Sequence, residues 1–120
     1  MKVQFYGVRG SYPVPASENF STVKYGGNTT CVSISNELSD GTIDRLVIDC
    51  GTGAVQLGKD IVSNMFKGVE GKEVALCFTH LHPDHTQAYP FFAPNYIPGT
   101  KMYLIGMEAL NKDVGRCLKM

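Results

Sequence analysis

Residues 73–85 read EVALCFTHLHPDH, and this stretch decides both the fold class and the chemistry that the chain can support. Its first six residues are nearly all apolar, as expected for an interior strand of a sheet that is covered on both faces. The polar segment that follows contains Asp84 and all three histidines of the protein. The stretch therefore predicts a buried strand over 73–78 that ends in a histidine-rich turn.

Four further segments are typical of β-strands, because their residues are β-branched, aromatic or alternating in polarity. Two of them flank the sequence Ser39-Asp40-Gly41, which predicts a hairpin with a longer connection. No periodicity is found between residues 8 and 27, and a loop of this length inside a compact domain is often functional. The predicted strands lie at 2–6, 29–35, 43–49 and 101–105.

Three helices are predicted, the first and the last of them from apolar residues at helical spacing. Residues 54–67 carry one stripe on Ala54, Leu57, Ile61 and Met65. A short helix is predicted from about Asp84 toward Phe92, and a last one carries its stripe on Leu110, Val114, Cys117 and Leu118. This order of strands and helices favours a mixed α/β fold with one β-α-β crossover and helices packed on a sheet.

Composition and charge exclude several classes of protein. Lys+Arg and Asp+Glu both number 11, and the zero net charge argues against a nucleic-acid binder that relies on a broad basic field, while leaving room for a local basic patch. No apolar run approaches the roughly 20 residues that span a bilayer, and the N-terminus lacks the apolar stretch of a signal peptide. The four cysteines form no C-x-x-C pair, so reduced thiols in a cytoplasmic protein that does not bind membranes are the simplest expectation. They are Cys31, Cys50, Cys77 and Cys117.

Four metal-donor side chains lie within six residues of the turn. His80 and His82 are alternate residues and can point the same way, whereas Asp84 and His85 start the following helix and can point at a second spot nearby. Imidazole and carboxylate groups together suit zinc, manganese and iron. Four donors in this arrangement favour two metal ions over one. The alternative is a solvated histidine-rich loop with no ligand role, which the clustering and the interposed carboxylate oppose.

The motif H-x-H-x-D-H at residues 80–85 resembles the signature of the metallo-β-lactamase superfamily. The strand that ends in Asp49, followed by Cys50-Gly51-Thr52-Gly53, is similar to the upstream aspartate motif of that superfamily. Three further segments resemble its phosphodiesterase-like branch, which includes cyclic phosphodiesterases and relatives of the tRNA 3′-processing nuclease. They are GVRGSYPVP at 7–15, KYGGNTTCVSI at 24–34 and HTQAYPFF at 85–92.

The resemblance implies a role for each donor. His80 and His82 would bind a first metal ion, and Asp84 and His85 a second, with zinc as the first choice and manganese or iron as alternatives. Asp84 would also steer a proton in catalysis. Asp49 would orient the ligands through hydrogen bonds from behind them, although a turn former at the end of the strand is the alternative role.

The resemblance also implies a metal-dependent hydrolase, most closely a phosphodiesterase that uses a metal-bound hydroxide. Its substrate would be a cyclic nucleotide, a cyclic phosphate or an RNA 3′-end. Arg9 and Ser11, in the long loop, are candidates to touch the phosphate, with simple solvent exposure as the alternative. Thioester or lactam hydrolysis on the same site, or a non-catalytic metal-binding or interaction module, remain the other hypotheses.

The chain departs from the family pattern because no histidine follows His85. The resemblance predicts later ligands, so we expect residues 1–120 to form a single partial domain, the N-terminal half of an αββα sandwich. Truncation, a split gene or a degenerate homologue would each explain this. By itself, the chain is expected to bind metal weakly, to show little turnover, and to expose the sheet face that would pack on the missing half or on another copy.

Overall fold

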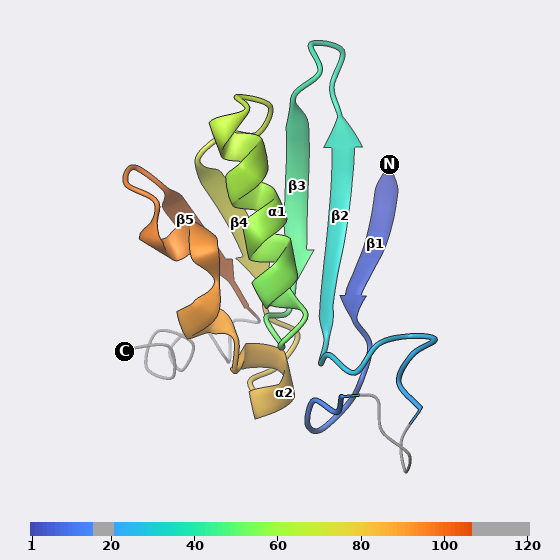
Figure 1. Ribbon diagram of the computed structural model, residues 1–120. Coiled ribbons are helices and arrows are strands. Elements are labelled where there is room, and N and C mark those ends of the chain that lie inside the picture. The colour runs from blue at the N-terminus through green and yellow to red at the C-terminus, as the bar shows by residue number, and fades with distance from the viewer. Residues whose placement is uncertain (16–20, 107–120) are drawn as a thin grey trace.

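A five-stranded mixed sheet with the strand order β1-β2-β3-β4-β5 forms the framework of the protein, as shown in a computed structural model that describes residues 1–15 and 21–106 (Figure 1). The strands are β1 (Lys2–Gly7), β2 (Cys31–Glu37), β3 (Ile43–Ile48), β4 (Glu73–Cys77) and β5 (Lys101–Ile105). The helices are α1 (Ala54–Phe66), α2 (Pro83–Thr86) and the 3-10 turns η1 (Tyr89–Phe91) and η2 (Ala93–Tyr96). The predicted α/β fold is confirmed.

The strand directions bring the ends of the central strands together. β1, β2 and β3 pair antiparallel, and the β2–β3 connection turns at Gly41, whose φ is +84°. β3, β4 and β5 pair parallel, with α1 as the crossover between β3 and β4. Because parallel strands end at the same edge of a sheet, the residues that follow β3 and β4 are close neighbours. The predicted hairpin and crossover are both confirmed.

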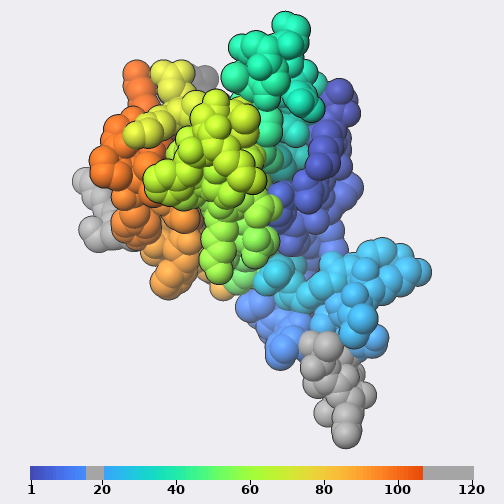
Figure 2. Space-filling view, turned by 45° about the horizontal axis from the view of Figure 1, so that its top comes forward, coloured from blue at the N-terminus to red at the C-terminus, as the bar shows by residue number. Residues whose placement is uncertain are grey.

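The hydrophobic core lies between α1 and one face of the sheet. Leu57 and Ile61 of α1 are fully buried and belong to one cluster with Val47 of β3 and Leu76 of β4. Figure 2 shows α1 (green) between the orange segment that contains η1, η2 and β5 on one side and β1 (dark blue) on the other. Cys31 lies in the same cluster, and its burial raises the pKa of its thiol to about 12. Cys31 thus packs as a small buried hydrophobe with a free thiol.

The predicted short helix over residues 84–92 is wrong in its length. The chain forms one turn of α-helix, α2, and then two separate 3-10 turns, each of which has a proline at its start. Proline has no backbone N–H and clashes with the preceding turn, so Pro90 and Pro94 prevent one continuous helix. The predicted last helix with its stripe on Leu110, Val114, Cys117 and Leu118 lies outside the described residues.

The face of the sheet opposite α1 is apolar and incompletely covered. The strand register places its side chains in two rows that cross all five strands. Phe5 is 68% exposed and Tyr103 is 41% exposed. The sequence predicted that the strand over 73–78 is covered on both faces, but the described residues cover only the face on the α1 side. The rows are Val3, Ile34, Leu46, Ala75 and Tyr103, and Phe5, Val32, Ile48, Cys77 and Ile105; we call these ten residues the apolar sheet face.

Within residues 1–15 and 21–106, the helices are all too short or too polar to traverse a lipid bilayer.

Candidate metal centre

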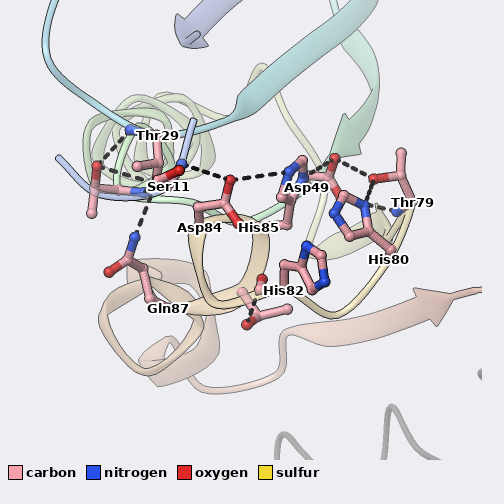
Figure 3. Close-up of polar contacts among 11 residues, drawn as sticks. Ser11, Thr29, Asp49, Thr79, His80, His82, Asp84, His85 and Gln87 are labelled. Carbon is pink, nitrogen blue, oxygen red and sulfur yellow. Dashed lines mark hydrogen bonds and ion pairs between the residues drawn. The ribbon is translucent and has the colours of Figure 1, made fainter. Parts of the chain in front are cut away.

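The histidine-rich turn lies at the edge of the sheet where the parallel strands β3 and β4 end (Figure 3). Asp49 follows β3 directly, and Thr79, His80 and His82 follow β4. Pro83 starts α2, because a proline at the first helical position loses no hydrogen bond. This turn of helix then carries the donors of Asp84 and His85 back toward the ends of the strands.

Asp49 is the buried polar group at the centre of the site. Its carboxylate accepts hydrogen bonds from the backbone N–H of Thr79 (2.9 Å), the Thr79 hydroxyl (2.8 Å) and Nδ1 of His85 (2.8 Å). The residue is only 2% exposed, and a buried carboxylate is tolerated where such donors satisfy it. Its φ of +62° lies in the left-handed region, which aspartate adopts more readily than most residues.

The contact with Asp49 determines which nitrogen of His85 is available for a ligand. An ionised carboxylate can only accept, so the Nδ1 atom of His85 carries the proton in this hydrogen bond. In a neutral imidazole the lone pair is then on Nε2. This Nε2 atom lies 3.4 Å from Oδ2 of Asp84.

Asp84 is held in its position from the long N-terminal loop. The backbone N–H of Ser11 donates to Oδ2 of Asp84 at 3.1 Å. This hydrogen bond lowers the pKa of the Asp84 carboxyl, and the nearby His85 and His82 lower it further. Asp84 is therefore an ionised carboxylate, able to act as a metal ligand, beside the Nε2 lone pair of His85.

The three imidazoles gather beside one another rather than pointing apart (Figure 3). The ring centroids of His80 and His82 are 4.7 Å apart with an interplanar angle of 76°, and those of His80 and His85 are 4.0 Å apart with an angle of 49°. The His80–His82 separation is close to the value of about 5 Å that two imidazoles would have on one tetrahedral ion. The donor types predicted from the sequence therefore do meet in space.

The residues fit a divalent ion most closely at the pair of His85 and Asp84. Zinc binds histidine nitrogen and carboxylate oxygen at about 2.0–2.2 Å, so two such donors on a tetrahedral ion are separated by about 3.4 Å. The 3.4 Å between His85 Nε2 and Asp84 Oδ2 matches this separation. Across residues 1–15 and 21–106, no three His, Cys, Asp or Glu side chains form a ready-made coordination sphere. The two-ion arrangement therefore stays a prediction.

The two candidate phosphate-binding residues lie in different surroundings. Ser11 reaches the site with its backbone N–H, at a φ of +72°. Arg9 donates from Nε to the carbonyl of Tyr12 (2.9 Å), and its guanidinium lies 5.2 Å from the centre of the Tyr12 ring. The structure thus brings Ser11 to Asp84 and engages Arg9 with Tyr12.

Glycines of the segment Cys50-Gly51-Thr52-Gly53 allow the backbone to approach the site closely. A Cβ on Gly51 would lie 2.3 Å from the carbonyl oxygen of Asp84, and one on Gly53 would lie 2.5 Å from that of Tyr6. Cys50 also pairs with the helical segment, because its N–H donates to the carbonyl of His85 at 2.7 Å. The contacts of Cys50 and Gly51 attach α2 to the end of β3, and that of Gly53 lies against β1.

Thr79 is the site residue to which sequence reasoning assigned no role. Its side chain contacts Asp49, 30 positions earlier, and Nδ1 of His80 (3.1 Å). Its place directly before the first histidine of the motif was the one signal that the sequence offered.

No protein-family model matches the chain, and neither a curated protein nor a solved structure with significant similarity was found.

Proposed function

We propose that this protein supplies the metal-binding site of a metal-dependent hydrolase. The observation that carries the proposal is the pair of His85 Nε2 and Asp84 Oδ2, 3.4 Å apart, with Asp49 hydrogen-bonded behind His85. In metal sites, a histidine ligand usually donates the N–H of its second ring nitrogen to a partner such as a carboxylate. A solvated histidine-rich loop without a ligand role would not require a buried carboxylate such as Asp49 behind His85.

Each side chain has a separate role in the proposed site. Asp49 orients His85, and the Ser11 N–H keeps Asp84 ionised and directed at the same point. His80 and His82 complete the donor set from the β4 side. His85 and Asp84 would hold a divalent ion there, and the ion would act as a Lewis acid that polarises an ester and activates water. Asp84, which the Ser11 contact holds as the carboxylate, is the residue positioned to accept a proton.

The proposed substrate class is a phosphodiester: a cyclic nucleotide, a cyclic phosphate or an RNA 3′-end. Support for this class comes from the resemblance of residues 7–15 to the phosphodiesterase-like branch, together with the contact that joins this loop to Asp84. A thioester or lactam is the competing substrate class on the same site. Assay of bis(p-nitrophenyl) phosphate beside a thioester and a lactam distinguishes the classes.

Zinc binding tests the proposal most directly. We expect the chain to bind zinc or manganese in competition with a chromophoric chelator, and His82→Ala to weaken binding at least tenfold. His82 is exposed and caps a helix through its backbone, so its removal should leave the thermal unfolding temperature unchanged.

Lys59→Ala, on the exposed side of α1, is the matched control and should bind zinc like the unmodified protein. Equal zinc affinity in the His82→Ala and unmodified proteins would contradict a metal site. If His82→Ala loses metal binding but a hydrolytic protein that contains this site keeps its activity with the same change, the site binds metal without a catalytic role.

We further propose that the apolar sheet face associates with a second copy of this chain. The face presents two apolar rows across five strands, and contiguous apolar patches of this kind favour association. We expect the weight-average mass by light scattering to exceed the monomer mass of 13.1 kDa and to rise with protein concentration.

Phe5→Lys, at the exposed edge of the apolar sheet face, should shift the protein toward the monomer. Phe66→Lys is the control, because Phe66 is 79% exposed at the end of α1 and lies off this face. A monomer at all concentrations in the unmodified protein would refute the self-association.

A further inference from the structure

Thr79 connects the buried carboxylate of Asp49 to a second histidine. Its backbone N–H and its hydroxyl bind the two oxygens of Asp49, at 2.9 and 2.8 Å. The same hydroxyl oxygen lies 3.1 Å from Nδ1 of His80. Asp49 therefore touches His85 directly and His80 through one intervening hydroxyl (Figure 3).

The single hydroxyl proton of Thr79 decides the direction of both contacts. A carboxylate oxygen cannot donate, so the proton of Thr79 lies in the 2.8 Å hydrogen bond to Asp49. This charge-assisted bond is stronger than one to a neutral ring. The hydroxyl oxygen has only lone pairs left for His80, and the Nδ1 atom of His80 must therefore be the donor.

We propose that Thr79 is a positioning residue that fixes the tautomer of His80. It holds the proton of His80 on Nδ1 and leaves the lone pair on Nε2, the same state that Asp49 imposes directly on His85. The buried carboxylate of Asp49 thus fixes the tautomers of two imidazoles that lie on different elements: His80 follows β4 and His85 lies on α2. The effect on metal affinity rests on the proposed function, whereas the tautomer of His80 does not.

The tautomers of the imidazoles test this role directly. All three histidines of the chain lie in this turn, so two-bond ¹H–¹⁵N correlation spectra of the metal-free protein, at a pH where the rings are neutral, report on this site alone. We expect Nδ1–H for both His80 and His85 in the unmodified protein. Thr79→Val removes the hydroxyl while keeping the branched shape and the backbone N–H, and His80 should change to the Nε2–H form that unconstrained histidine prefers.

His85 is the internal control, because its contact with Asp49 does not pass through the threonine hydroxyl. It should keep Nδ1–H in Thr79→Val, and Thr79→Ser should restore the unmodified pattern at His80. Zinc affinity should fall about tenfold in the valine variant and recover in the serine variant, as is typical when one outer partner of a ligand is removed.

The two proposals fail separately. If His80 carries its proton on Nε2 in the unmodified protein, or keeps Nδ1–H in Thr79→Val, the positioning role is wrong; the first of these results needs no variant to fold. If the tautomers follow the expectation but the unmodified protein binds no zinc, the positioning role stands and the hydrolase proposal is lost.

Discussion

Asp49→Asn is expected to weaken zinc binding about 100-fold, at the upper end of the usual effect of removing an outer partner of a metal ligand. Asp49 accepts hydrogen bonds from three donors on Thr79 and His85. In asparagine an NH₂ group, which can only donate, replaces one of the two carboxylate oxygens. At least one of the three donors would therefore face another donor. His85 would then present its Nδ1 lone pair to the amide and its proton toward Asp84, which removes the free Nε2 atom. Competition with a chromophoric chelator measures the affinity.

The asparagine variant isolates the effect on the ligands from an effect on folding. Asparagine matches aspartate in size and also tolerates a φ of +62°, so the backbone should be retained. Asp44→Asn, an exposed position on β3, is the control for the loss of one negative charge and should leave zinc affinity unchanged. An unaltered His85 tautomer and unaltered affinity in Asp49→Asn would show that Asp49 acts only as a turn former.

Gly51→Ala is expected to destabilise the protein by about 3 kcal/mol, the upper range for forcing an extra atom into a packed site. The new Cβ would lie 2.3 Å from the carbonyl oxygen of Asp84 and 2.4 Å from Oγ1 of Thr29, which is itself fully buried. Neither contact can persist, so α2 or the segment at Thr29 must move. The thermal unfolding temperature should fall by about 10 °C.

Displacement of α2 gives this variant a second measurable effect. Because Asp84 and His85 lie on α2, zinc affinity of the folded variant should also decrease. Gly71→Ala is the matched control: a Cβ there meets no atom within 4 Å, and the expected change in unfolding free energy is within about 0.5 kcal/mol. Equal stability of the two variants would show that the approach of Gly51 to α2 is not a constraint.

Local sequence patterns predicted much of the fold. The strands over 43–49 and 101–105 and the helix over 54–67 agree with β3, β5 and α1 to within one residue, because their periodicity is a property of neighbouring residues. The helix over 84–92 was wrong, because Pro90 and Pro94 interrupt the helical hydrogen bonds and leave one turn of α-helix followed by two 3-10 turns. The exposure of the apolar sheet face was expected from the resemblance alone.

The sequence predicted which residues of the candidate site can bind a metal, but not the hydrogen bonds that hold them in place. His80, His82, Asp84 and His85 stand within six residues and are recognisable by type. The role of Thr79 depends on a hydrogen bond to a residue 30 positions away, and that of Ser11 on one to a residue 73 positions away. No local spacing encodes such contacts.

By itself, the sequence determined where the strands and the long helix form and which side chains can donate to a metal, since both follow from residue type and short-range period. Only the tertiary structure decided which nitrogen of His85 is free, because the parallel ends of β3 and β4 bring Asp49 beside a histidine 36 positions later. The position of the proton depends on a hydrogen-bond partner that is distant in sequence, and only the folding of α2 against the end of β3 brings that partner into contact.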